Sequence, residues 1–304
     1  MKSSYYVGVS FYKSQIQLAE IDHGKKMNVT ALNERNTSID FSHDGNFSPD
    51  HPQLFTFIYE LEELLKQNKI HAKTISFALP TEPTLIAVIP MDVSLQGPRL
   101  ASHIQWEFEQ YYPGVPVKDF IISAYPIPGA TKSLKHVFLV AVRKGLVGFL
   151  KRAASELRLD VHLVDIDHFS AEKTLRHCHP ELMKENLMLF GIRGSGMDAS
   201  VVSQGEYTDY RYLAFDQQED VKKGILSYKQ YLEQKNGSQA PAKVVLYGFD
   251  VTPKTINHIQ RETGIQTMAL DAVRNMLPSK KIYEEYVKEN ARFAAAIGLA
   301  LRTQ

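Results

Sequence analysis

The sequence predicts an α/β protein built from two halves. Each half opens with antiparallel strands and continues with strands that alternate with helices, a pattern typical of helices packed on a mixed sheet. A glycine-containing strand hairpin near the start of each half marks this repeat. Apolar residues at helical spacing between the later strands predict the helices. The chain has 304 residues, which is enough for about two domains.

The composition argues against several classes of protein. Hydrophobic residues make up 44% and charged residues 23% of the chain, as in ordinary globular proteins. No stretch approaches the roughly 20 apolar residues of a membrane span, and the N-terminus has no signal-peptide run. The net charge of +1 and the scattered Lys and Arg residues disfavour nucleic acid as a partner. Because Cys178 is the one cysteine, no internal disulfide is possible, and we expect a cytoplasmic protein that a partner could hold at a membrane.

The elements of the first half follow from strand-like runs, amphipathic stretches and turn residues. The strands are short apolar runs bounded by turn signals. The helices place apolar residues on one stripe, and Pro113 with Gly114 ends the second helix. In order, we expect strands 5–10, 15–22 and 27–33, a loop 36–51, a helix 52–68, strands 74–78 and 84–89, a helix 97–112, strands 120–127 and 136–142, a helix 144–157, and a strand 161–166.

The second half is expected to open at Asn186, after a helix over 170–177. It begins with three strands of alternating pattern and continues with helices between shorter strands. In order, we expect strands 187–192, 197–203 and 207–213, a helix 217–235, a strand 244–246, a helix 253–263, a strand 265–270, and a last helix 283–301.

Two hairpins carry the most information about the fold. The first runs from Gly8 towards Leu18, and the second spans residues 187–202. Each reads as a strand, a tight turn and a strand. One such hairpin in each half resembles the duplicated core of the actin-like, or ribonuclease H-like, ATPase fold. In that fold the two hairpins hold phosphates from opposite sides of a cleft.

Further segments extend the resemblance to one family. The first hairpin supplies Gly8, Ser14, Ile16, Leu18 and Glu20. The other segments are residues 104–113, 138–144, 164–171 and 294–302. In this order and over nearly the whole chain, they resemble the PilM family of type IV pilus assembly proteins, which are actin-like relatives of FtsA.

The resemblance implies a domain organisation. Residues 1–79 would form the actin-like first half and 80–165 an inserted α+β subdomain. Residues 166–185 would form a connector, and 186–304 the second half, whose closing helix returns to the first. No amphipathic tail of the FtsA kind follows that helix, so no direct membrane insertion is expected.

The resemblance also implies a partner. In the family, the cytoplasmic N-terminal peptide of the membrane protein PilN docks between the first subdomain and the inserted one. If that carries over, the groove lies near the helix 97–112 and the strands 84–89 and 120–127. An apolar groove can bind a short peptide without catalysis.

The positions that the resemblance assigns to the nucleotide cleft depart from the actin-like pattern. These positions are Gly8, Ser10, Tyr12, Lys13, Ser14, Gln17, Gly191, Arg193, Gly194, Gly248 and Phe249. Ser10 stands where the pattern has an aspartate, and Tyr12, Arg193 and Phe249 add bulk. An ATP cleft needs carboxylates that hold the metal and glycines that let backbone N–H groups approach phosphate. We therefore predict a degenerate cleft without a cofactor, in which ATP with magnesium is disfavoured.

A deletion agrees with these losses. In the family, a capping subdomain lies between the second hairpin's sheet and the helix before the adenosine strand, and it closes over the nucleotide. Here residues 212–215 run almost directly into the helix 217–235. The capping subdomain is therefore expected to be reduced or missing.

Several polar residues have a functional and a structural interpretation. Lys13 and Arg193 are interpreted as solvated cations at the hairpin tips, with a metal-free anion site as the alternative. Ser10 is interpreted as a small turn residue rather than a weak ligand. Asp165 and Asp167 stand at i and i+2 on a strand, so both are expected to face one side. A structural or cleft-lining role in the connector is preferred for them over a metal or acid/base pair.

Aromatic and metal-like clusters are weighed in the same way. Trp106, Tyr111 and Tyr112 form a possible partner surface, because Trp and Tyr dominate interfaces, although a Trp on an amphipathic helix more often belongs to the core. His177 and His179 at a helix end face apart, and Cys178 has no second cysteine. No metal site is predicted.

The sequence thus predicts a degenerate, non-catalytic assembly protein of the PilM type. It would be a cytoplasmic scaffold beneath the inner-membrane platform of a pilus or related secretion system, with a PilN-like protein and other platform components as partners. Three alternatives stay open. One is an active ATP-dependent switch of the same family. Another is a sugar or acetate kinase-like enzyme, and the third is the cytoplasmic part of a GspL-type secretion protein.

Overall fold

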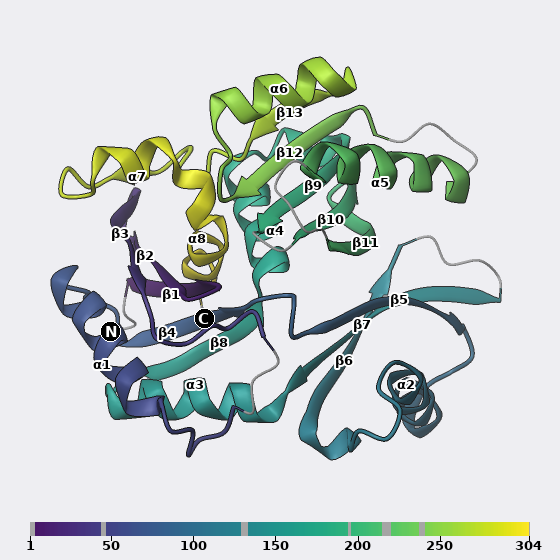
Figure 1. Ribbon diagram of the computed structural model, residues 1–304, viewed down its shortest axis with the longest axis horizontal. Coiled ribbons are helices and arrows are strands. Elements are labelled where there is room, and N and C mark those ends of the chain that lie inside the picture. Colours follow the sequence, from purple (N-terminus) through teal and green to yellow (C-terminus); the bar gives the residue numbers. More distant parts are fainter. Residues whose placement is uncertain are drawn as a thin grey trace.

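Three β-sheets organise the part of the chain that the structure describes. The computed structural model describes residues 4–43, 47–128, 133–193, 196–214, 220–236 and 241–303. In Figure 1 the first-half sheet lies at the left, the second-half sheet lies above it to the right, and a three-stranded sheet lies at the lower right. No helix among the described residues is long and apolar enough to cross a membrane.

The first sheet has six strands in the order β14-β3-β2-β1-β4-β8. They are β1 (Tyr5–Tyr12), β2 (Gln15–His23), β3 (Met27–Asn36), β4 (Thr74–Leu79), β8 (Asp160–Ile166) and β14 (Leu277–Pro278). The first three form an antiparallel meander, and β4, β8 and β14 join in parallel. The helices α1 (Leu54–Gln67) and α3 (Lys144–Glu156) cover one face with apolar side chains. The sheet is buried on both faces, which explains the long apolar runs in β1 and β2.

A smaller sheet, in the order β5-β7-β6, is inserted into the first half. Its elements are β5 (Leu85–Asp92), α2 (Gly97–Tyr111), the short 3-10 helix η1 (Val117–Asp119), β6 (Phe120–Ile127) and β7 (Leu134–Arg143). The predicted insertion, 80–165, extends beyond this sheet. The later part of that range, α3 and β8, lies on the first sheet, because β8 pairs with β4 and α3 packs on α1.

The second half repeats the meander. Its sheet has the order β11-β10-β9-β12-β13. The elements are β9 (Asn186–Arg193), β10 (Gly196–Ser203), β11 (Glu206–Ala214), α5 (Asp220–Asn236), β12 (Lys243–Gly248), α6 (Pro253–Thr263) and β13 (Gln266–Ala269). Only residues 215–219 separate β11 from α5, so no capping subdomain fits between them.

Two helices pack against each other between the halves. They are α4 (Asp167–Cys178), followed by the 3-10 helix η2 (Leu182–Lys184), and α8 (Ala294–Ala300). Gly298 allows their close approach, because a Cβ there would lie 1.7 Å from the carbonyl oxygen of Ser170. In Figure 1, α8 stands between the first sheet and the second-half elements. This contact explains the small residues near the end of the chain.

The predicted last helix, 283–301, is broken into α7 (Glu284–Lys288), the 3-10 helix η3 (Asn290–Phe293) and α8. Asn290 lies at the break. Its buried side chain accepts from the backbone N–H of Ala272 at 2.6 Å and donates to the carbonyl of Val287 at 2.9 Å. These bonds fix a bend that a helix-period pattern does not reveal. The other predicted helices and strands are confirmed, with ends shifted by a few residues.

Candidate functional site

Residues of the two halves meet across the cleft at an aromatic stack. Tyr12, at the end of β1, and Phe249, just after β12, have ring centroids 3.7 Å apart and planes 22° from parallel. The guanidinium of Arg292 lies 5.3 Å from the Phe249 centroid and pairs with Glu34 at 3.0 Å. The stack closes one side of the cleft with side chains of this chain.

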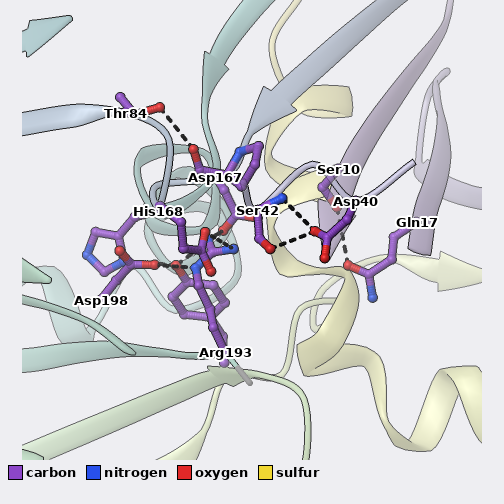
Figure 2. Close-up of polar contacts among 12 residues, drawn as sticks. Ser10, Gln17, Asp40, Ser42, Thr84, Asp167, His168, Arg193 and Asp198 are labelled. Carbon is purple, nitrogen blue, oxygen red and sulfur yellow. Dashed lines mark hydrogen bonds and ion pairs between the residues drawn. The ribbon is translucent and has the colours of Figure 1, made fainter. Parts of the chain in front are cut away.

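A buried arginine occupies the middle of the cleft. Arg193, the last residue of β9, is only 5% exposed. Its Nε donates to Asp198 on β10 at 2.8 Å, and its Nη2 lies 2.6 Å from Asp167 at the start of α4. Its Nη1 lies 3.7 Å from Glu82, in the link between β4 and β5. Figure 2 shows Arg193 beside Asp167 and Asp198. We call Arg193, Asp167, Asp198 and Glu82 the arginine cluster.

The charges of the arginine cluster are unequal, since one guanidinium faces three carboxylates. Burial raises the pKa of Asp167 to about 7; Arg193 opposes this shift, while Asp198 and Glu82 add to it. Burial also disfavours the charge of Asp198, but Arg193 outweighs this effect, and the pKa of Asp198 is lowered. Tyr210 further stabilises that carboxylate by donating its hydroxyl at 2.7 Å. Ion pairs hold the cluster together, although the buried Nη2 of Arg193 lies close to Asp167 without the geometry of a hydrogen bond.

His168 extends the polar network beneath the arginine cluster. Its two ring nitrogens lie 2.8 Å from the hydroxyls of Tyr247 and Ser200. Burial lowers the pKa of His168 to about 4, so the ring is neutral at physiological pH. Since both nitrogens are engaged, the ring has a structural position rather than that of a free base.

Little space remains in the cleft. The cavity has a volume of about 20 Å³. It is lined by Phe11, Tyr12, Gln17, Asp167, Ile192, Arg193, Tyr247, Gly248, Phe249, Arg292 and Ala295. A space of this size holds about one water molecule. The buried Nε2 of Gln17 has no hydrogen-bond partner among the described residues, which is consistent with a water there.

A second concavity is much larger, with a volume of about 390 Å³. We call it the groove. Its floor is one face of the inserted sheet, formed by Ile121, Ser123 and Tyr125 of β6 and, directly across the ladder, Val142, Val140 and Phe138 of β7. The opposite face of that sheet packs on α2 through Phe108 and Leu139. The alternation of the strands thus places one apolar face under a helix and leaves the other in the groove.

Three aromatic rings from three parts of the chain meet at the inner end of the groove. Phe138 comes from β7, Phe169 from α4 and Tyr207 from β11. Their centroids lie 5.9 Å apart for Phe138–Phe169 and for Phe138–Tyr207, and 5.3 Å apart for Phe169–Tyr207. We call them the ring junction. The inserted sheet, the connector helix and the second half all contribute to the groove.

Charged side chains line the rest of the groove, and most are paired. Arg302 contacts Asp165 at 2.5 Å, and Arg176 contacts Glu172 at 2.5 Å. Glu206 also lines the groove and leaves its lining with one more acid than base. An apolar floor with a polar rim is the usual build of a site that binds part of another molecule.

Sequence comparison identifies the family. A sequence profile described as "Type IV pilus assembly protein PilM" matches residues 8–235, about three quarters of the chain. The chain belongs to the PilM family of type IV pilus assembly proteins. No curated protein matches the chain.

Solved structures with the PilM and actin-like folds resemble the chain. The structure of a "PilM-PilN type IV pilus biogenesis complex" has a TM-score of 0.76 and 16% identity, over 98% of each chain. A Bacteroides thetaiotaomicron protein with an actin-like ATPase fold has a TM-score of 0.54 and 11% identity, over 90% of this chain and 93% of that one. The protein EutJ from Carboxydothermus hydrogenoformans has a TM-score of 0.51 and 12% identity, over 99% and 90%. The predicted actin-like fold is confirmed.

The glycines that the PilM resemblance assigned to the nucleotide cleft serve packing instead. A Cβ at Gly8 would lie 2.1 Å from the carbonyl oxygen of Ala296 in α8. A Cβ at Gly191 would lie 2.3 Å from the Tyr247 hydroxyl. Gly248 has a φ of +102°, and a Cβ there would lie 2.4 Å from the carbonyl oxygen of Ile192. Gly194 lies outside the described residues.

The polar positions of the first hairpin divide into two groups. Ser10 and Gln17 are buried and share a hydrogen bond of 3.3 Å (Figure 2). Lys13 and Ser14 form the exposed turn, where Lys13 has a φ of +49° and its Nζ lies 6.0 Å from the Tyr12 ring centroid. The interpretation of Lys13 as a hairpin-tip cation agrees with this position.

Two predictions about charged residues are wrong. Arg193 is neither a solvated cation nor an open anion site, because it is buried among carboxylates. Asp165 and Asp167 do not face one side. The strand ends at Ile166 and α4 begins at Asp167, three residues earlier than predicted, so strand alternation stops between the two. Asp165 consequently lines the groove, whereas Asp167 lines the cleft.

The aromatic residues of α2 lie away from the groove. Trp106 is 53% exposed and Tyr111 is also exposed, so the preferred core interpretation of Trp106 is wrong. Tyr112 is half-buried beside Phe120, with centroids 5.5 Å apart. Among the predicted groove elements, β6 lines the groove. No residue of β5 (Leu85–Asp92) lines it, and α2 packs on the opposite face of the sheet.

The residues around Cys178 make ordinary structural contacts. The thiol donates to the carbonyl of Ala272 at 3.2 Å, and burial raises its pKa to about 12. A ring nitrogen of His179 lies 3.1 Å from the carbonyl of Asp271. Within the described ranges, no three His, Cys, Asp or Glu side chains gather as a metal site would require.

Sequence reasoning missed the ring junction and most of the arginine cluster. Phe138, Phe169 and Tyr207 are ordinary apolar residues of predicted strands and helices, and their spacing carries no signal. Glu82 lies in a proline-rich link, where an acidic residue is expected to be solvated. Of the arginine cluster, Arg193 in its glycine-rich hairpin and Asp167 in the connector were the two residues that the sequence singled out.

Proposed function

We propose that this PilM-family chain is a non-catalytic scaffold of a type IV pilus platform. On this proposal, its own side chains fill the ancestral nucleotide cleft, and its groove binds the cytoplasmic N-terminal peptide of a PilN-like membrane protein. The observation that carries the proposal is the contrast between a cleft of about 20 Å³ and a groove of about 390 Å³.

The filled cleft supports the absence of ATP chemistry. Arg193 brings a positive charge that a metal would otherwise supply, and three carboxylates already pair with it. The Tyr12–Phe249 stack occupies positions that the resemblance assigns to the nucleotide cleft, which disfavours a purine or a triphosphate there. A phosphate approaching Asp167 and Asp198 would meet like charge without a metal to neutralise it. These features favour a pseudo-ATPase.

The groove supports peptide recognition. Its volume lies within the range of about 300–1,000 Å³ that ligand pockets span. Exposed apolar side chains at its floor, such as Tyr125 at 54%, lose water contact when a peptide covers them. The structurally similar PilM-PilN complex makes a PilN-like protein the natural partner. The scaffold would then be cytoplasmic, held at the inner membrane through this partner and beside other platform components.

Calorimetric titration with ATP and magnesium tests the cleft. We expect no heat of binding and no rise in the melting temperature at millimolar nucleotide, because side chains of the protein fill the cleft. Titration of the same sample with the PilN peptide serves as the control for a competent protein. Micromolar ATP binding would overturn the pseudo-ATPase proposal and favour an ATP-dependent switch of the same family.

Fluorescence anisotropy tests the groove. The probe is a labelled peptide with the N-terminal cytoplasmic residues of the PilN homologue from the same genome, and its scrambled sequence is the control. We expect saturable binding of the native peptide alone. Equal binding of both peptides, or of neither, would contradict the groove assignment.

A further inference from the structure

One short segment belongs to both the cleft and the groove. Asp165, Ile166 and Phe169 line the groove, while Asp167, between them, lines the cleft. This alternation arises where β8 ends and α4 begins. We call residues 165–169 the shared segment. Any force that moves Asp167 therefore acts on side chains that form the groove wall.

Arg193 fixes the shared segment from outside. It comes from β9 and contacts Asp167 at 2.6 Å, so it joins the second half to the start of α4. It also approaches Glu82 at 3.7 Å, in the link that leads into the inserted sheet. The three parts of the chain that meet at the ring junction are thus the same three that Arg193 brings together.

Further contacts continue from the shared segment into the groove. The Tyr207 hydroxyl donates to the backbone carbonyl of His168 at 3.4 Å, and the Tyr207 ring lies at the ring junction. On the other side, Asp165 accepts from the Ser170 hydroxyl at 3.1 Å and pairs with Arg302. The shared segment is therefore tied to both walls of the groove, through the backbone of His168 and through the side chain of Asp165.

We propose that Arg193 is a positioning residue for the groove, and that the arginine cluster couples peptide binding to the relative placement of the two halves and the inserted sheet. This proposal rests on the proposed function of the groove. An internal arginine would then do for this chain what a bound ligand does in a two-site protein: it stabilises one arrangement of the parts around it.

The physical basis is the state of the carboxylates without the arginine. When Arg193 loses its charge, Asp167 and Asp198 are left buried with no cation between them. The carboxyl of Asp167 then has no guanidinium partner on β9, and the gain in solvation favours an outward shift that the shared segment must follow. Coupling of this kind is reciprocal, so a peptide in the groove should also tighten the arginine cluster.

The test uses the full chain with Arg193→Gln, Arg193→Lys and a matched control, Ile225→Ala. Ile225 is fully buried on α5, in the core on the far face of the second-half sheet, and it touches neither the cluster nor the groove. It destabilises the second half without removing a tie to the shared segment. Two quantities are measured, the dissociation constant of the labelled PilN peptide and the hydrogen exchange of residues 165–169 without peptide.

We expect Arg193→Gln to weaken peptide binding by about tenfold and to speed hydrogen exchange in the shared segment. Arg193→Lys keeps the charge and should recover part of both losses. Ile225→Ala should lower the melting temperature yet leave the dissociation constant within about twofold. If Arg193→Gln does not fold, Asp167→Asn keeps the shape and weakens the same ion pair, and a few-fold loss is expected.

Unchanged affinity and exchange in Arg193→Gln would overturn the coupling. So would equal effects in Arg193→Gln and Ile225→Ala, because the arginine would then act only through general stability. If the wild-type chain fails to bind the peptide, the proposed function of the groove fails. The exchange measurement would still decide whether Arg193 positions the shared segment.

Discussion

The cleft and the groove are two concavities at junctions of the same parts of the chain, yet they are built in opposite ways. In the cleft, an arginine pairs with carboxylates, two aromatic rings stack, and about 20 Å³ remains. In the groove, an apolar sheet face stays uncovered and about 390 Å³ is open. Side chains of the chain itself fill the cleft, whereas the groove is open.

The difference lies in how each concavity treats its buried polar groups. An emptied cleft between two rigid halves would leave buried polar groups unpaired, and each would cost about 1–3 kcal/mol. Arg193 and its carboxylates reduce that cost, although the buried Nε2 of Gln17 keeps no hydrogen-bond partner among the described residues. The groove carries no such burden, because its exposed apolar floor costs less than an unpaired buried charge.

The strongest test of this difference is to fill the groove with a large side chain. Ser123→Trp places a large ring on the floor between Ile121 and Tyr125. We expect the affinity for the PilN peptide to fall about 1,000-fold, equivalent to about 4 kcal/mol. Anisotropy measures the loss, and Ser155→Trp, exposed on α3 outside the groove, is the control. Native affinity in Ser123→Trp would place the peptide elsewhere.

The pH dependence of stability probes the charges of the cleft. The folded-state pKa of Asp167 is raised to about 7, so the folded state holds a proton that the unfolded state has lost, and stability falls as pH rises from 4 to 7. The pKa of His168 is lowered to about 4, so its contribution to stability rises with pH between 4 and 6.5. The two effects oppose each other in the wild type.

Single substitutions should separate these two effects. Relative to the wild type, Asp167→Asn should gain stability with rising pH and His168→Gln should lose it. The slope would reach about 1.4 kcal/mol per pH unit, or about 3 kcal/mol between pH 4 and 6.5. Urea unfolding at several pH values measures both variants. Parallel curves for the three proteins would mean that neither group titrates as the structure implies.

Removing one ring of the Tyr12–Phe249 stack should change the free energy of unfolding by less than the pH effects above. Phe249→Ala removes the ring that packs on Tyr12 and faces Arg292. Because Phe249 is half-buried, we expect a loss of about 2 kcal/mol in the free energy of unfolding. The opened cleft still lacks an acid at Ser10, so calorimetry should detect no binding of ATP with magnesium. Binding restored by this one substitution would mean that bulk alone excludes the nucleotide.

The smallest effect is expected on the far face of the inserted sheet. Trp106 is exposed on α2 and stacks on His103 with centroids 5.7 Å apart. Trp106→Ala should change the free energy of unfolding by no more than about 0.5 kcal/mol and leave peptide affinity unchanged. A large loss of affinity would move the binding surface from the groove to α2.

The sequence was sufficient for most of the elements because their signals are local. The long apolar runs of the strands at both hairpins and the leucine stripe of α1 depend on neighbouring residues alone. The break at Asn290 was not predictable, since its partners Ala272 and Val287 lie outside any helical window. The boundary of the insertion was misjudged for a similar reason, because the pairing of β8 with β4 is a long-range contact.

The same distinction between local and long-range contacts decides which features of the cleft and the groove could be predicted. The departure at Ser10 could be recognised, because Ser10 occupies a defined position in a hairpin. The burial of Arg193 could not, because Glu82 and Asp167 come from distant stretches of the chain and only Asp198 is close in sequence. The groove was placed near β6, but the role of Tyr207 depends on how the second half packs on the inserted sheet.

The ring junction has a consequence for how the protein is made. Phe138, Phe169 and Tyr207 enter the chain in succession, and the groove lacks its inner wall until β11 has been synthesised and has joined its sheet. Domains of a nascent chain fold from the N-terminus onwards, so the inserted sheet can form long before the groove does. A membrane partner that binds there would bind only molecules whose β11 has been synthesised and has joined its sheet. Incompletely folded chains would therefore not enter the assembly.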